Sequence, residues 1–299
     1  MSQKIYVIGS SNTDMVIKSN KLPAPGETIL GGIFLMNAGG KGANQAVAAA
    51  KLEADVIFVS KVGDDIFGQQ ALDGFKSLGI NTDFVFTDYE NPSGIALILV
   101  DSNGENSIAV ASGANGNLQV DEVAQILSQV NEDDIVLLQL EIPISTVEFA
   151  IKACFEKKAT IILNPAPAQK LDESVYPFIS IITPNETEAE ILTGIKVIDL
   201  ESAEQVANVL HDKGIPNVII TLGARGAYFH HKNFQKLIPS PVVQAIDSTA
   251  AGDVFNGALA VGLSEGKEFE EAISFACRAA SISVTRMGAQ ASTPLRSEI

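Results

Sequence analysis

The feature that most limits the fold of this chain is a regular alternation between short apolar runs and amphipathic stretches. The apolar runs are rich in β-branched residues and have the length of strands: "KIYVIG", "ADVIFVSKVG", "DIVLLQLE", "TIILNPAP", "ISIITPN" and "NVIITLG". Between them lie helical patterns such as "KGANQAVAAAKL", "GQQALDGFKSLG", "STVEFAIKACFEKK" and "AEQVANVLHDKG". Continuous apolar runs of this kind are typical of strands that are buried on both faces. The pattern therefore predicts an α/β fold with a Rossmann-like, mainly parallel sheet flanked by helices.

Two segments interrupt the alternation. Residues 14–36 and 93–111 contain no helical pattern, and the second segment includes "DSNGEN", which is typical of a hairpin turn. We expect the two segments to form a small antiparallel sheet that projects from the main body as a lid. One face of this sheet should be apolar and should include Ile95, Leu97 and Leu99. The sequence has no internal repeat, so residues 1–299 are predicted to be a single domain with the lid segments inserted.

Charge and cysteine content narrow the classes of partner. The formal net charge is −16 and the pI is about 4.5, which makes a nucleic-acid backbone an unsuitable partner. Two cysteines without a CxxC motif suit a reducing compartment. The first apolar run, Ile5 to Ile8, is too short for a signal peptide, and no run approaches the roughly 18 residues of a membrane span. We therefore expect a soluble, cytoplasmic protein that binds neither nucleic acid nor membrane.

The stretch "IDSTAAGDVFNG" places one acidic residue, Asp253, among small residues immediately before an apolar helical pattern. A helix N-terminus offers free N–H groups and a partial positive charge, which stabilise either a capping carboxylate or a bound phosphate. The residues alone leave open whether Asp253 is only a helix cap or part of a phosphate site. At this position we expect the pKa of the Asp253 carboxyl to be lowered.

A glycine-rich segment, "NAGGKGANQAVAAA" at 37–50, precedes an alanine-rich helical pattern. It matches neither the P-loop nor the G-x-G-x-x-G pattern. Glycines and a helix start allow a ligand to approach the backbone closely, but a tight turn before a packed helix would explain the segment equally. Lys41 and Asn44 are unusual residues for a turn alone, which favours a binding site.

Two further polar clusters follow predicted strands. In "TPNETEAE" at 183–190, Asn185 could simply cap a helix, or Asn185 and Glu188 could hold a hydrated Mg²⁺ from one helix face. In "TLGARGAY" at 221–228, the glycines could form a plain left-handed turn or a loop that faces phosphate. The carboxyl ends of parallel strands meet at one edge of a sheet, so both clusters are candidates for a shared site.

Taken together, these motifs resemble those of the ribokinase family, the PfkB-type carbohydrate kinases. "GGKGANQA" and "DSTAAGDVFNGALA" are similar to the two signatures of that family, and "NTD", "LNPAPA", "TPNETEAE" and "VTRMGAQAS" occur in the expected order over essentially the whole chain. The resemblance implies a ribokinase-like fold and ATP-dependent phosphorylation of D-ribose at the 5-hydroxyl, giving D-ribose 5-phosphate and ADP. A kinase of another sugar, sugar acid or nucleoside, and a non-catalytic sensor of sugar or nucleotide, remain the alternatives.

The resemblance also implies roles for individual residues. Asp253 would be the catalytic base, and the N–H groups of Ala250, Ala251 and Gly252 would form an anion hole for the transferred phosphoryl group. The sugar contacts would be Asn12, Asp14, Gly40, Lys41, Asn44, Glu141 and Asp253. The ATP contacts would be Asn185, Thr221, Gly223, Gly226, Gly252 and Cys277. Relatives often have His or Asn where this chain has Cys277, so the adenine contact at that position departs from the family pattern.

Two metal ions and a second subunit are implied in the same way. Mg²⁺ would accompany ATP, with Glu188 acting through water, and K⁺ would be an activating cation. The K⁺ positions are Asp247, Thr249, Ser283, Arg286, Gly288 and Ser292, which would act mostly through main-chain oxygens. A homodimer through the two lids is expected because unpaired sheet edges invite pairing with a second copy. The alternative is a monomer whose sheet edge is protected by Lys18 and Lys21.

Overall fold

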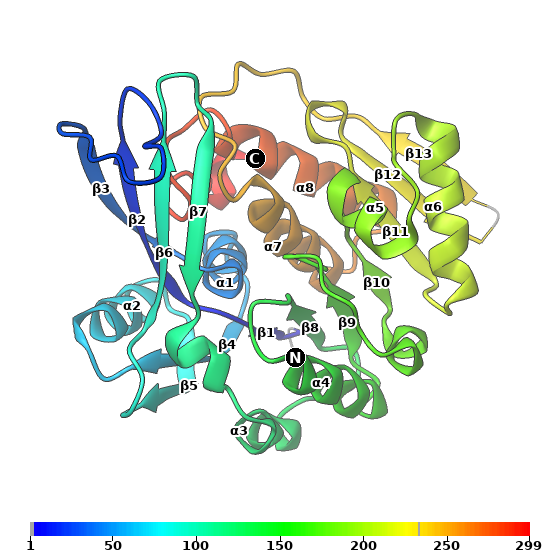
Figure 1. Cartoon of the computed structure of the whole chain (residues 1–299). Coiled ribbons are helices and arrows are strands. Elements are labelled where there is room, and N and C mark those ends of the chain that lie inside the picture. The colour runs from blue at the N-terminus through cyan, green and yellow to red at the C-terminus, as the bar shows by residue number, and fades with distance from the viewer. Residues whose placement is uncertain (1–2, 233) are drawn as a thin grey trace.

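The larger of two β-sheets organises the molecule, as Figure 1 shows for a computed structural model that describes residues 3–232 and 234–299. Its nine strands lie in the order β13-β12-β11-β10-β9-β8-β1-β4-β5. The strands are β1 (Ile5–Ile8), β4 (Val56–Gly63), β5 (Asn81–Asp88), β8 (Ile135–Leu138), β9 (Thr160–Leu163), β10 (Ile181–Ile182), β11 (Asn217–Thr221), β12 (Ala227–His231) and β13 (Phe234–Ile238).

The strand pairing confirms the predicted fold class. The strands from β5 to β11 in this order are all parallel, and β12 and β13 extend the sheet in antiparallel fashion. All six predicted strands are present, as β1, β4, β8, β9, β10 and β11. Three strands, β5, β12 and β13, were not predicted.

Helices cover both faces of this sheet. They are α1 (Lys41–Lys51), α2 (Ile66–Ser77), α3 (Val120–Ala124), α4 (Ile144–Glu156), α5 (Glu186–Thr193), α6 (Leu200–Asp212), α7 (Ala251–Ser264) and α8 (Phe269–Ser283). One apolar cluster joins the sheet to α1, α2, α7 and α8, and the other joins it to α3, α4, α5 and α6. No helix in the described part of the chain has both the length and the apolar character to cross a bilayer.

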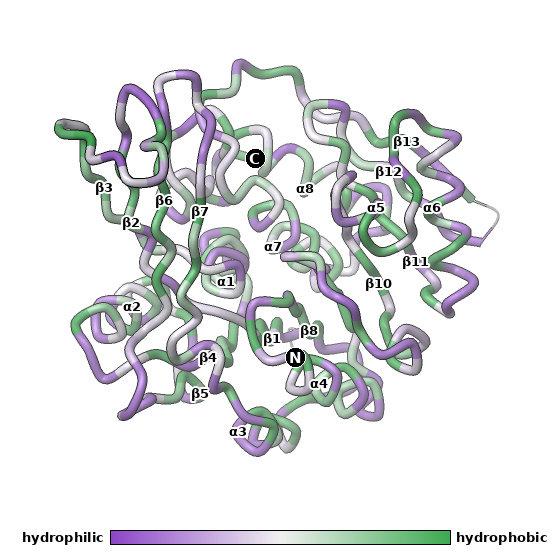
Figure 2. The backbone as a smooth tube through the Cα atoms, in the orientation of Figure 1, coloured by the Kyte–Doolittle hydropathy of each residue, from purple (hydrophilic) through white to green (hydrophobic). Residues whose placement is uncertain are grey.

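The two clusters explain why the strands are continuously apolar. Along β1, Ile5 and Val7 pack into one cluster, whereas Tyr6 and Ile8 pack into the other. Successive residues of a strand point to opposite faces, so residues at both odd and even positions must be apolar when helices cover both faces. Figure 2 shows apolar residues along the central strands and hydrophilic residues on the outer turns of α6.

The second sheet has four strands in the order β3-β2-β6-β7. They are β2 (Asn12–Lys18), β3 (Ile33–Gly39), β6 (Gly94–Val100) and β7 (Asn106–Ala111), so the two predicted segments do build one small sheet. The sheet is mixed rather than purely antiparallel, because β2 and β6 pair in parallel. The expected hairpin turn joins β6 to β7, where the Asp101 N–H donates to the Glu105 carbonyl at 2.9 Å.

The prediction of a single apolar face on this small sheet was wrong. Strand pairing places Phe34 and Leu97 on one face, where they are 60% and 55% exposed. Ile33 and Ile108, which are 64% and 55% exposed, lie on the opposite face. Apolar residues are therefore exposed on both faces, and no helix of the described ranges covers the outer half of this sheet (Figure 1).

Candidate active site

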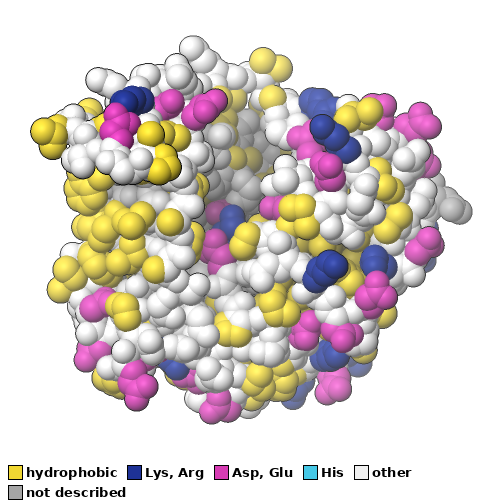
Figure 3. Space-filling model, viewed as in Figure 1, with side chains coloured by type: hydrophobic (Ala, Val, Ile, Leu, Met, Phe, Trp, Pro, Cys, Tyr) yellow, Lys and Arg dark blue, Asp and Glu magenta, His cyan; other side chains and the backbone are white. Residues whose placement is uncertain are grey.

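A polar cavity of about 170 Å³ lies where β9, β10 and β11 end and α7 begins. This is the edge of a parallel sheet at which ligands bind in α/β proteins. The cavity is lined by Lys41, Asn164, Ala166, Thr183, Asn185, Glu188, Thr221, Ser248, Ala250, Ala251, Gly252, Asp253 and Asn256. Figure 3 shows the molecule hollowed between the small sheet and the main body, with acidic and basic side chains on the floor of the hollow.

Asp253 is the third residue of α7 and is only 6% exposed. Its carboxylate accepts hydrogen bonds from two side-chain amides, Asn44 Nδ2 at 2.9 Å and Gln45 Nε2 at 3.0 Å. The N-cap of α7 is Ala250, in a left-handed conformation with φ 59°. Asp253 therefore does not act as the helix cap, which removes the simpler of the two interpretations left open by the sequence.

The expectation of a lowered pKa for Asp253 was wrong. Burial raises the pKa of this carboxyl, and the nearby Glu141 raises it further. Lys41 and the hydrogen bonds from Asn44 and Gln45 act in the opposite direction but do not outweigh burial. Desolvation disfavours the charged form, and here it is the largest influence on the pKa. A raised pKa makes Asp253 a stronger base than a surface aspartate.

Lys41 lies among four carboxylates. Burial tends to lower the pKa of its ammonium group, but the opposite charges outweigh burial, so the pKa is raised. The carboxylates, in order of effect, are Asp253, Glu141, Glu188 and Asp14. Lys41 therefore carries a stable positive charge at neutral pH. It lies between the two sides of the site described next, one with Asp14 and Glu141 and the other with Asn185 and Glu188.

One side of the site is formed by Asp14 and Glu141. Burial, followed by Glu141 and Asp253, raises the pKa of Asp14 to about 6. The Glu141 Oε2 atom accepts hydrogen bonds from Ser10 Oγ at 2.6 Å and from the Lys41 N–H at 3.0 Å. These contacts place two predicted sugar-binding carboxylates beside the predicted base.

Asn12 and Gly40 support the same side. The Asn12 Oδ1 atom accepts a hydrogen bond from Asn115 Nδ2 at 2.7 Å, which leaves the Asn12 amide as a donor. Gly40, with φ 89°, is the N-cap of α1, and a Cβ on it would lie 2.7 Å from the Asn12 backbone nitrogen. A glycine is therefore required where the small sheet meets α1.

The other side of the site contains Asn185 and Glu188, which form a capping box at the start of α5. The Glu188 N–H donates to Asn185 Oδ1 at 2.8 Å, and the Asn185 N–H donates to Glu188 Oε2 at 2.9 Å. Both residues nevertheless line the cavity, so the capping and binding interpretations are compatible. Burial raises the pKa of the Glu188 carboxyl, although the Asn185 N–H and Lys41 oppose this shift.

The remaining predicted ATP contacts are divided. Thr221 lines the cavity, and Gly252 does so in the first turn of α7. Gly223, Gly226 and Cys277 are not among the lining residues. Gly226 has φ 103°, and a Cβ on it would lie 2.1 Å from the Ile238 carbonyl oxygen, so the left-handed turn accounts for this glycine. Cys277 is buried in the apolar cluster of α8 and is a free thiol, as is the buried Cys154.

The predicted anion hole is only partly available. The Ala251 N–H already donates to the Ser248 carbonyl at 3.2 Å. Within the described ranges, the N–H groups of Ala250, Gly252 and Asp253 have no hydrogen-bond acceptor. A helix N-terminus with free N–H groups can stabilise an anion, and two of the three predicted donors, Ala250 and Gly252, remain free for that purpose.

Two of the predicted cation-binding residues, Thr249 and Gly288, bond to the carboxylate of a third, Asp247. Its Oδ1 atom accepts from the Thr249 N–H at 3.0 Å and Oγ1 at 2.6 Å, and its Oδ2 atom accepts from the Gly288 N–H at 2.9 Å. The Ser283 carbonyl oxygen accepts a hydrogen bond from the Arg286 N–H at 3.0 Å. The other five carbonyl oxygens accept no hydrogen bond from the described residues: those of Asp247, Thr249, Arg286, Gly288 and Ser292. Unused carbonyl oxygens are suitable ligands for a monovalent cation.

Sequence reasoning missed several polar residues of the site. Gln45 bonds to Asp253, Gln139 bonds to Gln45, and Asn164 accepts from Gln45. All three are buried. Their signal in the sequence was a polar residue inside or directly after an apolar run, as in "LLQLE" and "IILNP", because a buried amide must find a hydrogen-bond partner.

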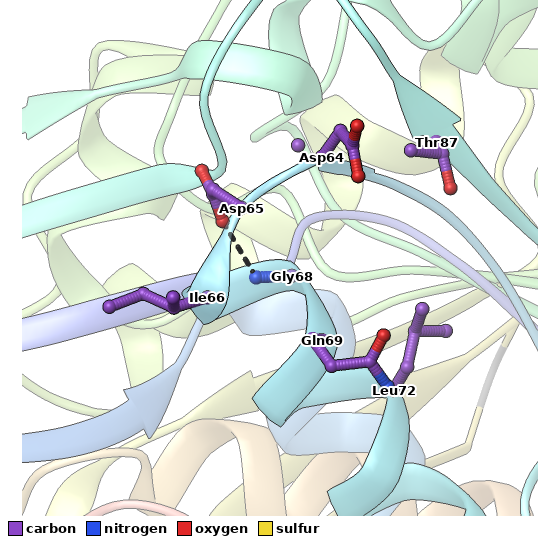
Figure 4. A pocket seen from close by; sticks show the side chains of 8 residues that line it. Asp64, Asp65, Ile66, Gly68, Gln69, Leu72 and Thr87 are labelled. Carbon is purple, nitrogen blue, oxygen red and sulfur yellow. Dashed lines mark hydrogen bonds between the residues drawn. The ribbon is translucent and has the colours of Figure 1, made fainter.

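A larger cavity of about 360 Å³ lies at the start of α2, away from these residues. Figure 4 shows Asp65 in this cavity with its carboxylate bonded to the Gly68 N–H. The Asp65 carboxylate also accepts from the Phe67 N–H and from the N–H and Oγ of Ser93. Its oxygens are thus engaged in capping α2 and anchoring the start of β6, so the smaller polar cavity is the better candidate for chemistry.

Known proteins resemble this chain over its whole length. The family model of pfkB family carbohydrate kinases matches residues 2–296. A ribokinase of Haemophilus influenzae is 48% identical over 298 residues, covering 100% of this chain and 97% of that protein. A deoxyribokinase of Salmonella typhi is 39% identical over 291 residues, covering 97% and 95%. The solved structure of Arabidopsis thaliana ribokinase complexed with ribose and ATP has a TM-score of 0.91, with 33% identity and coverage of 100% and 97%.

Proposed function

Because the chain belongs to the pfkB family of carbohydrate kinases, we propose that it transfers the γ-phosphoryl group of ATP to the 5-hydroxyl of D-ribose. The products are D-ribose 5-phosphate and ADP. The observation that carries this proposal is the position of Asp253, which is buried at the start of α7 between the Asp14–Glu141 side and the Asn185–Glu188 side of the site. A sugar on the first side and a nucleotide on the second would meet at this carboxylate.

In the proposed reaction, Asp253 accepts the proton of the 5-hydroxyl as that oxygen bonds to the γ-phosphorus and the bond to the β-phosphate oxygen breaks. Phosphoryl transfer passes through a loose transition state, so the proton leaves late and positioning dominates. The predicted anion hole of Ala250, Ala251 and Gly252 acts through its free donors, the N–H groups of Ala250 and Gly252. The Lys41 ammonium balances negative charge at the junction of the two substrates.

Two metal ions fit the donor groups that are present. Glu188 has one carboxylate oxygen left after capping, and Mg²⁺ is commonly held by one or two carboxylates together with substrate phosphates and water. When bound, Mg²⁺ would neutralise charge on the ATP phosphates. A K⁺ ion fits between two segments, the one before α7 and the one that begins at the end of α8, where most carbonyl oxygens of the predicted ligands accept no hydrogen bond from the described residues. These predicted ligands are Asp247, Thr249, Ser283, Arg286, Gly288 and Ser292.

A second candidate substrate is 2-deoxyribose, because one relative, 39% identical to this chain, is named a deoxyribokinase. A site that binds a hydroxyl rejects an analogue without it by up to about 10⁴-fold, because buried polar groups are left unpaired. Kinetics with ribose, 2-deoxyribose, other pentoses, hexoses and nucleosides, in a coupled assay of ADP release, test the assignment. We expect the highest kcat/KM with ribose, and equal values for ribose and 2-deoxyribose would contradict it. If no compound of this panel causes ADP release, a non-catalytic sensor of sugar or nucleotide would be favoured.

We also propose that the small sheet is a lid over the sugar and that two lids join in a homodimer. Exclusion of water would protect the γ-phosphoryl group from hydrolysis. The large exposed apolar side chains on both faces of the sheet support contact with a second copy. The free thiols of Cys154 and Cys277 support a cytoplasmic location.

A further inference from the structure

Two buried glutamines connect the carboxyl end of β8 to the carboxylate of Asp253. Gln139 Nε2 donates to Gln45 Oε1 at 2.6 Å, and Gln45 Nε2 donates to Asp253 Oδ1 at 3.0 Å. The same Gln45 amide also donates to Asn164 Oδ1 at 3.0 Å. Both glutamines are 0% exposed, so these bonds form without competition from water.

The chemistry of the groups fixes the direction of each bond. An ionised carboxylate only accepts, so Gln45 must turn its NH₂ group toward Asp253 and its oxygen toward Gln139. Gln139 must then present its own NH₂ group. A flipped Gln45 would place its oxygen against the carboxylate and its NH₂ group against that of Gln139. The two acceptors, Asp253 Oδ1 and Asn164 Oδ1, therefore set the orientation of Gln45, and Gln139 supports it by donating to Gln45 Oε1. The Gln139 Oε1 atom is itself buried and has no partner among the described residues.

The backbone leaves room for this arrangement at a specific glycine. A Cβ on Gly9 would lie 2.0 Å from Gln139 Oε1 and 2.9 Å from the Gly42 Cα. The loop after β1 and the first turn of α1 thus pack closely against the Gln139 amide.

The groups facing Asp253 show why a neutral donor matters there. From α1, Lys41 favours the ionised carboxylate, and the Asn44 and Gln45 amides do so through hydrogen bonds. Carboxylates approach from three other parts of the chain and oppose ionisation: Glu141 after β8, Asp14 on β2 and Glu188 on α5. Each donated hydrogen bond therefore helps to keep the carboxylate ionised in a buried, acidic site.

We infer that Gln45 is a positioning residue that holds one oxygen of the Asp253 carboxylate, and that Gln139 supports Gln45 in the required orientation. The inference rests on the proposed function, because it gives Gln45 a role toward the base of that reaction. Gln45 acts only through Asp253 and is itself not among the residues that line the cavity.

The first test is the pH profile of Gln45→Met, which keeps the side-chain length and removes the donor. We expect kcat to fall on the order of tenfold to 10²-fold, the scale that results when a reacting group is misplaced by about 1 Å. The acidic limb of kcat/KM should move to higher pH, because the ionised carboxylate has lost a donor. Gln139→Met should move it in the same direction by less.

The matched control is Thr146→Val, which removes another buried hydrogen bond, from Thr146 Oγ1 to the Leu118 carbonyl at 2.8 Å, far from Asp253 in the chain. Its pH profile should match that of the wild type. If Gln45→Met lowers Tm and activity but leaves the acidic limb unmoved, Gln45 has a packing role only, and the inference is wrong.

A second readout does not need catalysis. Carbon-13 NMR titration of the aspartate carboxyls, with Asp253→Asn identifying the signal, should give a higher midpoint for Asp253 in Gln45→Met than in the wild type. If the protein phosphorylates no sugar but the titration midpoint of Asp253 is higher in Gln45→Met, the proposed kinase reaction is refuted. The influence of Gln45 on the Asp253 carboxyl is then still supported. An active kinase with an unmoved midpoint and pH profile would overturn the inference.

Discussion

Asn44 Nδ2 donates to Asp253 Oδ2 at 2.9 Å and so ties the first turn of α1 to the first turn of α7, across 209 positions of the chain. The other polar atom of this amide, Asn44 Oδ1, is buried and has no partner among the described residues. An unpaired buried acceptor is costly unless something fills it. A donor such as a sugar hydroxyl would satisfy this oxygen if the proposed reaction is correct.

Asp253→Asn should fold normally and lose turnover. The amide keeps the shape of the carboxylate but cannot accept the proton, and loss of a general base costs about 10²–10⁴-fold. The kcat and the Tm of the variant check this. Asp199→Asn, which changes the exposed N-cap of α6, is a matched control that should retain full activity. Turnover of Asp253→Asn close to that of the wild type would refute the proposed mechanism.

Ribose affinity should fall in acid solution because of Asp14. Its pKa is raised to about 6, so the neutral form accumulates as the pH falls below that value. A protonated carboxyl loses an acceptor for the sugar hydroxyls. Calorimetric titration of ribose without ATP should show a higher Kd at about pH 5 than at about pH 7.5. Asp14→Asn should bind weakly at both pH values, and a wild-type Kd that is independent of pH would exclude this role of Asp14.

The predictable part of the fold follows from burial on both sides of the sheet. In β1 every residue is buried, so residues at both odd and even positions of the strand are apolar, and this continuous apolar run is visible in the sequence. The same reasoning fails for the exposed strand Phe234–Ile238, which has no such run. It also fails for the small sheet, where apolar residues are exposed on both faces, so no alternation between apolar and polar residues marks one buried face.

The site was predictable in its motifs but not in its electrostatics. The resemblance identified Asp253, Lys41, Asp14 and Glu188, and the structure brings these four charged groups together. Proximity to a helix N-terminus was readable from the sequence, whereas the burial of the carboxylate was not, so the direction of the Asp253 pKa shift was mispredicted. Gln45 was missed because the resemblance assigned it no role, and its contact with Asp253, 208 positions away, is visible only in the fold.

Potassium should raise activity above that in sodium. The carbonyl oxygens of Asp247, Thr249 and Gly288 lie in a loop that the Asp247 carboxylate holds together, next to the start of α7. A bound cation would fix the shape of this loop, and Na⁺ is smaller and would fit less well. Titration of KCl against NaCl at constant ionic strength measures the effect. Asp247→Ala should require more K⁺ for half-activation, and equal rates in both salts would remove the cation from the proposal.

The exposed apolar side chains of the small sheet should be covered by a second copy in solution. The outer strand β7 is exposed at every position, and Phe34 on the other outer strand, β3, is 60% exposed. Unpaired edges and apolar faces of this kind favour association. Light scattering at micromolar concentration should therefore give twice the chain mass of 31.5 kDa. Phe34→Asp should shift the mass toward that of a monomer, since a charge would be buried in the contact.

Ile198→Asp, at a residue that is 67% exposed between α5 and α6, is the control and should leave the mass unchanged. A wild-type mass near 31.5 kDa with full activity would refute the lid-to-lid dimer and leave the proposed kinase reaction intact.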